Sequence, residues 1–271
     1  MRKLGMCVPM CYDGDIFDKM SVIKNAGFDT CFLAWPSVVE ISELKRHADT
    51  IGLEIETLHA PFGKSNSFWD ENSNEGDYFV EEIKKCIRDA GKNDIPYVVI
   101  HTGIGIEAPI SSRIGLARFE KLVVEAEKCG VKLSFENLEY PRLMALILDY
   151  FKCDTVGFCY DTGHENCFTP GLKMLPMFGD RLLCTHFHDN LSKSVLDTVN
   201  YRKDYHKIPF DGIIDFESIC KDLKKSGYTG SIMLEATNCY DTNFYGDLTF
   251  EEFVKKSYAS AVRLRKLTDG E

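Results

Sequence analysis

The chain has 271 residues, of which 44% are hydrophobic, and its formal net charge is −10. This length suits one large domain and excludes a membrane span, because no apolar run reaches the roughly 20 residues that a bilayer requires. The acidic balance disfavours a nucleic-acid partner, whose phosphates attract a basic surface, and the N-terminus turns polar too early for a signal peptide, so we expect a cytoplasmic protein.

Short apolar runs alternate with amphipathic stretches along the whole chain. The apolar runs predict eight strands, near Leu4–Val8, Thr30–Ala34, Glu54–His59, Tyr97–His101, Lys132–Glu136, Val156–Asp161, Leu182–His188 and Gly230–Glu235. Between them, apolar residues recur at helical spacing, as in Ile16, Met20 and Ile23. Strands that alternate with helices pair in parallel, and eight such units predict a single-domain (β/α)8 TIM barrel over residues 1–271. The alternative, a doubly wound open sheet, would gather its ligand residues at one switch point.

Glycines and capping patterns locate the helix ends. Five glycines lie between an amphipathic stretch and the next predicted strand, and each predicts a helix stop. They are Gly27, Gly52, Gly91, Gly130 and Gly227. Glycine tolerates the left-handed backbone conformation that ends a helix. The patterns Ser37-x-x-Glu40 and Thr249-x-x-Glu252 predict capping boxes at two helix starts. Two long loops, Ala60–Glu75 and Asp189–Ile214, are expected to shape access to the catalytic face.

The eleven cysteines include no C-x-x-C pair. Several lie inside apolar runs, for example Cys31, Cys159 and Cys184. Because free cysteine packs as a small hydrophobe, we predict reduced core cysteines, with a zinc–thiolate site or a cysteine nucleophile as the minor alternative.

Six of the predicted strands end in side chains of the kind that bind metal ions. These side chains are His59, His101, Glu136, Asp161 with His164 close behind, His186 with His188, and Glu235. The carboxyl ends of parallel barrel strands meet on one face, where active sites lie. Buried carboxylates gathered there without a cation would be strongly destabilising or would take up protons. The pattern therefore predicts a divalent-metal site.

Seven motifs in fixed order carry a resemblance to a known family. They are LHAPFG, VIHTG, ENL, CYDTGH, HFHDN, DYHKIPFDGIIDF and LEAT, between residues 58 and 237. The set resembles the xylose-isomerase-like TIM-barrel superfamily, which includes sugar and sugar-phosphate isomerases and epimerases, inosose-converting enzymes and endonuclease IV. In its isomerase branch, Glu, Asp, His and Glu from the last four strands hold one Mn²⁺, Mg²⁺, Co²⁺ or Zn²⁺ ion. The ligands that the resemblance implies here are Glu136, Asp161, His186 and Glu235.

The choice between two neighbouring histidines rests on the family pattern H-x-x-D/E, which His186 and Asp189 satisfy. His188 lies two residues further along the strand, so its side chain points to the same side and a swap stays open. We expect His188 to touch the substrate.

The resemblance to ketose epimerases also implies roles for the remaining residues. Glu136 and Glu235 would remove and return a proton beside a carbonyl group, while the metal stabilises the enediolate as a Lewis acid. His164 would donate to a substrate oxygen, and His59 and His101 would bind hydroxyl groups or a phosphate.

A second interpretation follows from the same family. Residue types matching all nine zinc ligands of endonuclease IV occur in order, namely His59, His101, Glu136, Asp161, His164, His186, Asp204, His206 and Glu235. A second or third zinc ion is therefore left open, and the alternative function is an endonuclease-IV-like phosphodiesterase acting on abasic DNA. The local basic cluster of Arg202, Lys203 and Lys207 fits a phosphate-bearing sugar equally well.

Together these features predict a metal-dependent sugar or sugar-phosphate isomerase or epimerase with a small-molecule substrate. The substrate-binding residues would be His59, His101, His164, His188, Asp204 and His206. Four aromatic residues after the second and third strands, Trp35, Phe62, Phe68 and Trp69, are interpreted either as sugar-stacking or as packing residues. A barrel that binds a sugar without catalysis is disfavoured, because every expected metal position holds a competent ligand.

Overall fold

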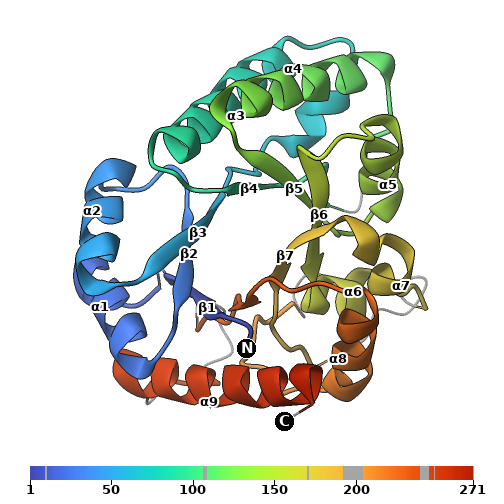
Figure 1. Ribbon diagram of the computed structural model, residues 1–271. Coiled ribbons are helices and arrows are strands. Elements are labelled where there is room, and N and C mark those ends of the chain that lie inside the picture. Colours follow the sequence, from blue (N-terminus) through green and yellow to red (C-terminus); the bar gives the residue numbers. More distant parts are fainter. Residues whose placement is uncertain are drawn as a thin grey trace.

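Eight parallel strands form a nearly closed barrel inside a ring of helices (Figure 1). The computed structural model describes residues 1–9, 11–105, 109–169, 171–191, 204–238, 244–246 and 248–270. The strands are β1 Leu4–Cys7, β2 Thr30–Ala34, β3 Glu54–His59, β4 Tyr97–Ile100, β5 Lys132–Glu136, β6 Val156–Asp161, β7 Leu182–His186 and β8 Ile232–Leu234. Their spatial order is β7-β6-β5-β4-β3-β2-β1-β8, which confirms the predicted (β/α)8 TIM barrel.

The barrel closes between β7 and β8 through the residue that follows β7. The Phe187 amide donates to the Met233 carbonyl at 2.8 Å, and the Glu235 amide donates to the Phe187 carbonyl at 3.0 Å. These bonds extend the hydrogen bonding of the barrel beyond the last residue of β7. They also position Glu235 at the carboxyl-terminal rim of the barrel.

The outer ring consists of helices that follow the strands. They are α1 Ile16–Ala26, α2 Ile41–Ile51, η1 Ser65–Trp69, α3 Glu75–Lys92, α4 Arg113–Cys129, α5 Pro141–Tyr150, α6 Thr162–Phe168, α7 Met174–Phe178, η2 Gly179–Arg181, α8 Phe216–Lys225 and α9 Phe250–Asp269. Within the described ranges, none of these helices is long and apolar enough to cross a membrane.

The predicted strand bounds are right for β2, β3, β5 and β6, and too long at one or both ends of the other strands. For β7 the reason is visible. The His188 amide donates to Thr162 Oγ1 at 3.0 Å, and Thr162 Oγ1 donates back to the His188 carbonyl at 2.7 Å. A side chain on α6 thus replaces the strand partner that His188 would have needed.

The predicted helix stops are confirmed at three glycines. Gly27, Gly52 and Gly130 have φ values of 114°, 71° and 67° and cap α1, α2 and α4. The helix stop predicted at Gly91 is wrong, because α3 continues through Gly91 to Lys92. Gly227 lies one residue beyond the Ser226 cap of α8.

One of the two predicted capping boxes exists. At the start of α9, Thr249 and Glu252 exchange side-chain and backbone hydrogen bonds in the predicted way. The capping box predicted at Ser37 is wrong, because α2 begins at Ile41 and its N-cap residue is Glu40. Ser37 Oγ instead accepts from the Val39 amide at 3.3 Å, so it stabilises the preceding turn.

The prediction of reduced cysteines is confirmed for nine residues, which have reduced thiols and are at least half-buried. It is wrong for Cys11, which is disulfide-bonded. Cys11 is exposed in the loop after β1, so it is not one of the core cysteines from which the prediction was made.

A buried arginine fixes the long loop between β3 and α3. Arg118 on α4 is 1% exposed, and its Nη1 donates to the carbonyls of Ser67, Phe68 and Asp70 at 3.0, 3.1 and 2.7 Å. Its Nη2 donates to the Ser73 carbonyl and, at 2.8 Å, to the Asp77 carboxylate. One guanidinium group thus donates hydrogen bonds to four backbone carbonyls of this loop.

We expect Arg118→Met to reduce the free energy of unfolding by about 3–5 kcal/mol, because four backbone carbonyls lose their buried donor. The matched control is Lys121→Met, since exposed Lys121 pairs with the same Asp77 carboxylate at 2.8 Å. A surface pair of this kind contributes about 1 kcal/mol or less. Urea unfolding followed by circular dichroism measures both variants, and equal losses would contradict the role given to Arg118.

Candidate metal centre

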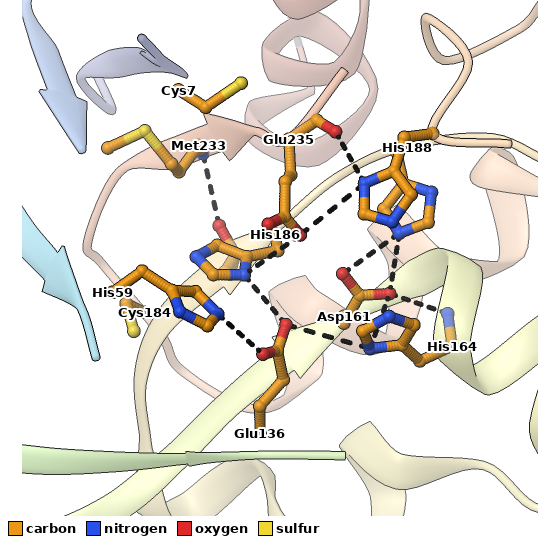
Figure 2. Close-up of polar contacts among 12 residues, drawn as sticks. Cys7, His59, Glu136, Asp161, His164, Cys184, His186, His188, Met233 and Glu235 are labelled. Carbon is orange, nitrogen blue, oxygen red and sulfur yellow. Dashed lines mark hydrogen bonds and ion pairs between the residues drawn. The ribbon is translucent and has the colours of Figure 1, made fainter. Parts of the chain in front are cut away.

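All ten predicted site residues come together at the carboxyl ends of the strands. Seven of them are labelled in Figure 2: His59, Glu136, Asp161, His164, His186, His188 and Glu235. His59, Glu136, Asp161 and His186 are the last residues of β3, β5, β6 and β7. His101 and Glu235 directly follow β4 and β8, and His164 lies on α6. The remaining three are His188, Asp204 and His206, from the segments after β7. Parallel strands put their last residues on one face, which is why residues far apart in sequence meet here.

The four residues predicted as ligands of one ion form a compact group. One potential ligand atom from each of Glu136, Asp161, His186 and Glu235 lies within 4.8 Å of the other three. His186 Nδ1 is 2.8 Å from Glu136 Oε1 and 3.3 Å from Glu235 Oε2. Three carboxylates and one imidazole in this arrangement form a donor set suited to a divalent cation.

A second group of the same size lies beside the first. His164, His188, Asp204 and His206 also offer atoms that all lie within 4.8 Å of one another. Asp204 Oδ2 is 3.3 Å from His164 Nε2 and 3.2 Å from His206 Nε2, and the rings of His188 and His206 stack with centroids 3.8 Å apart. His188 Nε2 is 3.0 Å from Asp161 Oδ1, so the two groups are in direct contact.

A third, smaller group shares Glu136 with the first. Glu136 Oε2 is 2.7 Å from His101 Nε2 and 3.4 Å from His59 Nε2. Figure 2 shows the Glu136 carboxylate pointing into the ring of site residues, with His59 and His186 on adjacent sides. Glu136 therefore connects the histidines of β3 and β4 with the four-residue group.

Several buried polar atoms in these groups lack a hydrogen-bond partner among the described residues. They include His186 Nε2, His188 Nδ1, Asp204 Oδ1 and Glu235 Oε2. A buried polar atom without a partner destabilises a protein, so such atoms are normally satisfied. Coordination to a cation would satisfy the atoms of His188, Asp204 and Glu235, and these residues therefore fit a metal site.

The electrostatics of the site show how strongly its charges depend on one another. Burial disfavours a charged carboxylate, yet His186, His101 and His59 hold the pKa of Glu136 well below its usual range. In the same way, burial is outweighed at Asp204, where His206, His164 and His188 lower the pKa. Against burial, the Asp204 carboxylate raises the pKa of His206 to about 10. Positive charge beside these carboxylates is thus favourable, and a divalent cation would supply it.

Two residues that the motifs contain, but to which the sequence analysis gave no role, hold the candidate ligands in place. Asn137 Nδ2 donates to the Asp161 carbonyl and Asn137 Oδ1 accepts from the Asp161 amide, both at 2.8 Å. A Cβ atom on Gly163 would lie 1.8 Å from His188 Cε1, so only glycine leaves room for the imidazole. In the sequence, the signal that could have identified Asn137 and Gly163 was their position in the motifs ENL and CYDTGH.

Asp189, the acidic member of the H-x-x-D pattern, is a structural anchor. Its buried carboxylate accepts hydrogen bonds from the amides of Phe210, Gly212 and Ile214 at 3.0, 2.9 and 3.1 Å. It therefore holds the segment that follows His206 against the end of β7.

A cavity of about 450 Å³ borders the groups of candidate metal ligands. Its described lining residues are His59, Phe62, His101, Ile104, Gly105, Leu138, Glu139, His164, Phe168, Asp204, His206, Glu235 and Thr237. Phe62 stacks on His101 with ring centroids 4.7 Å apart, and Phe168 stacks on His164 at 5.2 Å. The cavity lining therefore combines ionisable and apolar side chains, which suits a small polyhydroxylated molecule.

The four aromatic candidates separate into two kinds. Phe62 lines the cavity and is 48% exposed, whereas Phe68 and Trp69 are 0% and 2% exposed and pack in the core. Trp35 is not among the lining residues, and its Nε1 donates to Asp89 Oδ2 at 2.9 Å.

The predicted basic cluster contributes no cavity residue within the part of the chain that the structure describes. Arg202 and Lys203 lie outside the described residues. Lys207 is buried, and its Nζ lies over the ring of Phe244, 4.0 Å from the centroid. Glu139, in contrast, lines the cavity and was missed from the sequence.

Comparison with known proteins agrees with this architecture. A family model described as xylose isomerase-like TIM barrel matches residues 20–247. The uncharacterized protein y4fM of Sinorhizobium fredii is 27% identical over 94% of this chain and 90% of its own.

Solved structures share the fold at lower identity. D-psicose 3-epimerase of Clostridium cellulolyticum H10, solved with D-tagatose, has a TM-score of 0.78 at 16% identity and covers 98% of this chain and 99% of its own. The IolI protein with a bound zinc atom has a TM-score of 0.78 at 17% identity and covers 97% and 98%. A xylose isomerase-like TIM barrel/4-hydroxyphenylpyruvate dioxygenase fusion protein has a TM-score of 0.81 at 14% identity; it covers 98% of this chain, which spans 43% of the fusion.

Proposed function

Because the chain belongs to the xylose isomerase-like TIM-barrel family, we propose that it is a divalent-metal-dependent sugar isomerase or epimerase. The observation that carries the proposal is the group of Glu136, Asp161, His186 and Glu235, with Glu235 in the wall of a sugar-sized cavity. A structural neighbour named as a sugar 3-epimerase, and another with a bound zinc atom, support the same function and cofactor.

The four residues of this group would hold the ion. Bound there, the ion would supply Lewis-acid stabilisation of negative charge on the substrate. His186 Nδ1 has Glu136 Oε1 at 2.8 Å and Glu235 Oε2 at 3.3 Å, and the two carboxylates extend from β5 and from the end of β8. We infer that one carboxylate removes the proton beside the substrate carbonyl and the other returns it through an enediolate.

The surrounding histidines would bind and orient. His59, His101, His164 and His206 line the cavity and offer nitrogen atoms to substrate hydroxyl groups. His59 and His101 also contact Glu136, so they would fix the orientation of that carboxylate during proton transfer. His188, which is 0% exposed, contacts Asp161 and Asp204, so it is better placed to hold these ligands than to touch the substrate.

The second group favours one competing function. Because His164, His188, Asp204 and His206 can hold another cation, a multi-zinc phosphodiesterase acting on abasic DNA is the second candidate. It predicts two or three zinc ions per chain and cleavage of a duplex that contains an abasic site.

Solvent-proton exchange tests the first function directly. In D2O, the metal-loaded protein should introduce deuterium beside the carbonyl of a ketose from a panel of pentuloses and hexuloses, as seen by NMR. No exchange with any sugar of the panel, together with cleavage of abasic-site DNA, would replace the first function with the second.

A further inference from the structure

Three histidines surround one carboxylate in the second group of candidate ligands. Asp204 Oδ2 is 3.3 Å from His164 Nε2 and 3.2 Å from His206 Nε2. Asp204 Oδ1 is 3.8 Å from His188 Nδ1. The residues that match the zinc ligands of endonuclease IV include His164, Asp204 and His206, but they do not include His188. His188 is therefore an addition to that ligand set.

Two of the histidines bond to a backbone carbonyl through Nδ1. His164 Nδ1 is 3.1 Å from the Asn137 carbonyl oxygen. His206 Nδ1 is 3.0 Å from the Glu235 carbonyl oxygen. A carbonyl oxygen only accepts hydrogen bonds, so in the neutral rings Nδ1 carries the proton and Nε2, which faces Asp204, has the lone pair. Metal-ligating histidines show this arrangement, because they typically donate their other N–H to a carbonyl or carboxylate oxygen.

His188 follows the same pattern with its two nitrogens exchanged. Its Nε2 lies 3.0 Å from Asp161 Oδ1 and donates to that carboxylate (Figure 2). Its Nδ1, which faces Asp204, then has the lone pair in the neutral ring. Gly163 leaves space for this ring, and the Thr162 hydroxyl fixes the backbone of His188 through two hydrogen bonds. The ring is thus held with one nitrogen on each of the two four-residue groups.

The second group has the composition and the spacing of a four-coordinate zinc site. Three imidazoles and one carboxylate are ligands that zinc binds tetrahedrally. With bonds of about 2.0 Å, neighbouring ligand atoms of such an ion lie about 3.3 Å apart. The distances from the Asp204 carboxylate to the three imidazoles range from 3.2 to 3.8 Å. His164, Asp204 and His206 line the cavity, so an ion can reach the group from there.

We propose that His188 Nδ1 is the fourth protein ligand of a second zinc ion. The other ligands of this ion would be His164, Asp204 and His206. Four protein ligands leave a tetrahedral zinc ion without an open position, which is the mark of a structural site. The ion would therefore stabilise the carboxyl-terminal rim of the barrel. The inference goes beyond the proposed function and does not rest on it.

The second ion also decides which histidines remain for a substrate. With the ion bound, the Nε2 atoms of His164 and His206 would be metal ligands. His59 and His101, which also line the cavity, would then be the histidines left for substrate hydroxyl groups.

Zinc titration of the metal-free protein tests the proposal, with free zinc set by a chelator buffer and bound zinc measured by mass spectrometry. The unmodified protein should bind at least two zinc ions per chain. In His188→Gln, the amide nitrogen can take the position of Nε2 and still donate to Asp161, but no ring nitrogen faces Asp204. Loss of a group that only supports a ligand lowers metal affinity about 10- to 100-fold, so loss of the ligand itself should weaken one zinc ion about 100-fold or more. The affinity for another ion should stay unchanged.

The matched control is His47→Gln, on α2 and outside the groups of candidate ligands. It makes the same chemical change and should bind zinc like the unmodified protein. Circular dichroism of both variants shows whether the barrel is still folded.

Cobalt substitution reports whether the second site has an open position. Four-coordinate Co²⁺ absorbs visible light far more strongly than six-coordinate Co²⁺, so its spectrum identifies the second site. Added azide should leave this spectrum unchanged in the unmodified protein, because all four positions are filled. In His188→Gln, azide should bind at the vacated position and shift the spectrum.

The other outcomes would overturn the inference. A single zinc ion per chain in the unmodified protein would exclude the second site. Unchanged affinities in His188→Gln would exclude His188 as a ligand, and equal weakening of both ions would show that His188 acts only through Asp161. An azide shift in the unmodified protein would exclude the closed coordination. None of these measurements needs a substrate, so a failure here is distinguishable from a failure of the proposed isomerase or epimerase function.

Discussion

Glu235→Gln should lower turnover about 1,000-fold or more while leaving the barrel folded. The amide has the shape of the carboxylate but cannot take up the proton of the substrate. It is also a weaker metal ligand than the charged oxygen that now lies 3.3 Å from His186 Nδ1. The backbone of Glu235 keeps its hydrogen bond to the Phe187 carbonyl, so barrel closure should not suffer.

Two measurements separate the possible causes of that loss. Metal content shows whether the variant still binds the ion, and deuterium exchange in D2O shows whether a proton is still removed. A variant that keeps its metal and exchanges the proton, but forms no product, would identify Glu235 as the group that returns the proton. Unchanged turnover would rule Glu235 out as an acid or base. The control for the chemical change alone is Glu120→Gln, at an exposed position on α4.

The sequence was most informative where periodicity and side-chain chemistry coincide. Six of the eight predicted strands end in an ionisable residue, and the parallel barrel then requires these ends to meet, so the positions of Glu136, Asp161 and His186 follow from the pattern. The resemblance added Asp204 and His206, whose place beside His164 depends on a loop that periodicity does not describe.

What the sequence could not predict depends on contacts between distant segments. Nothing in the stretch ENLEY indicates that Glu139 faces the cavity, because its orientation depends on the amide of Gly105 in another loop. Gly91 was mistaken for a helix end because a glycine inside a helix has the same local sequence signal as one that ends it. Asp189 fitted a ligand pattern, and only the three loop amides bound to its carboxylate show that it is an anchor.

Removal of the metal should abolish turnover and lower the midpoint of thermal unfolding, because an ion that binds only the folded chain stabilises it. Dialysis against dipicolinate followed by calorimetry, with and without added Mn²⁺ or Zn²⁺, measures both effects. Recovery of turnover when the ion is restored separates removal of the metal from irreversible damage.

The size of this stabilisation should depend on pH in a defined direction. In the metal-free protein, the Glu235 and Glu136 carboxylates raise the pKa of His186 well above its usual range although burial opposes the shift. A histidine whose pKa is raised by folding contributes stability below its unfolded pKa of about 6.5, and that contribution is lost as the pH rises toward the folded value. Metal ligation instead requires the neutral imidazole, so metal affinity rises over the same range.

The metal-induced increase in the unfolding midpoint should therefore grow between about pH 6.5 and 8.5, because protons and the ion compete for the same atoms. His186→Gln removes the imidazole for which the proton and the ion compete and should flatten this dependence, while His47→Gln, on α2 and outside the groups of candidate ligands, should leave it unchanged. An increase that shrinks as the pH rises would show that the ion does not displace a proton from His186. Glu136, Asp161, His186 and Glu235 would then be held together by their own ion pairs and would not serve as metal ligands.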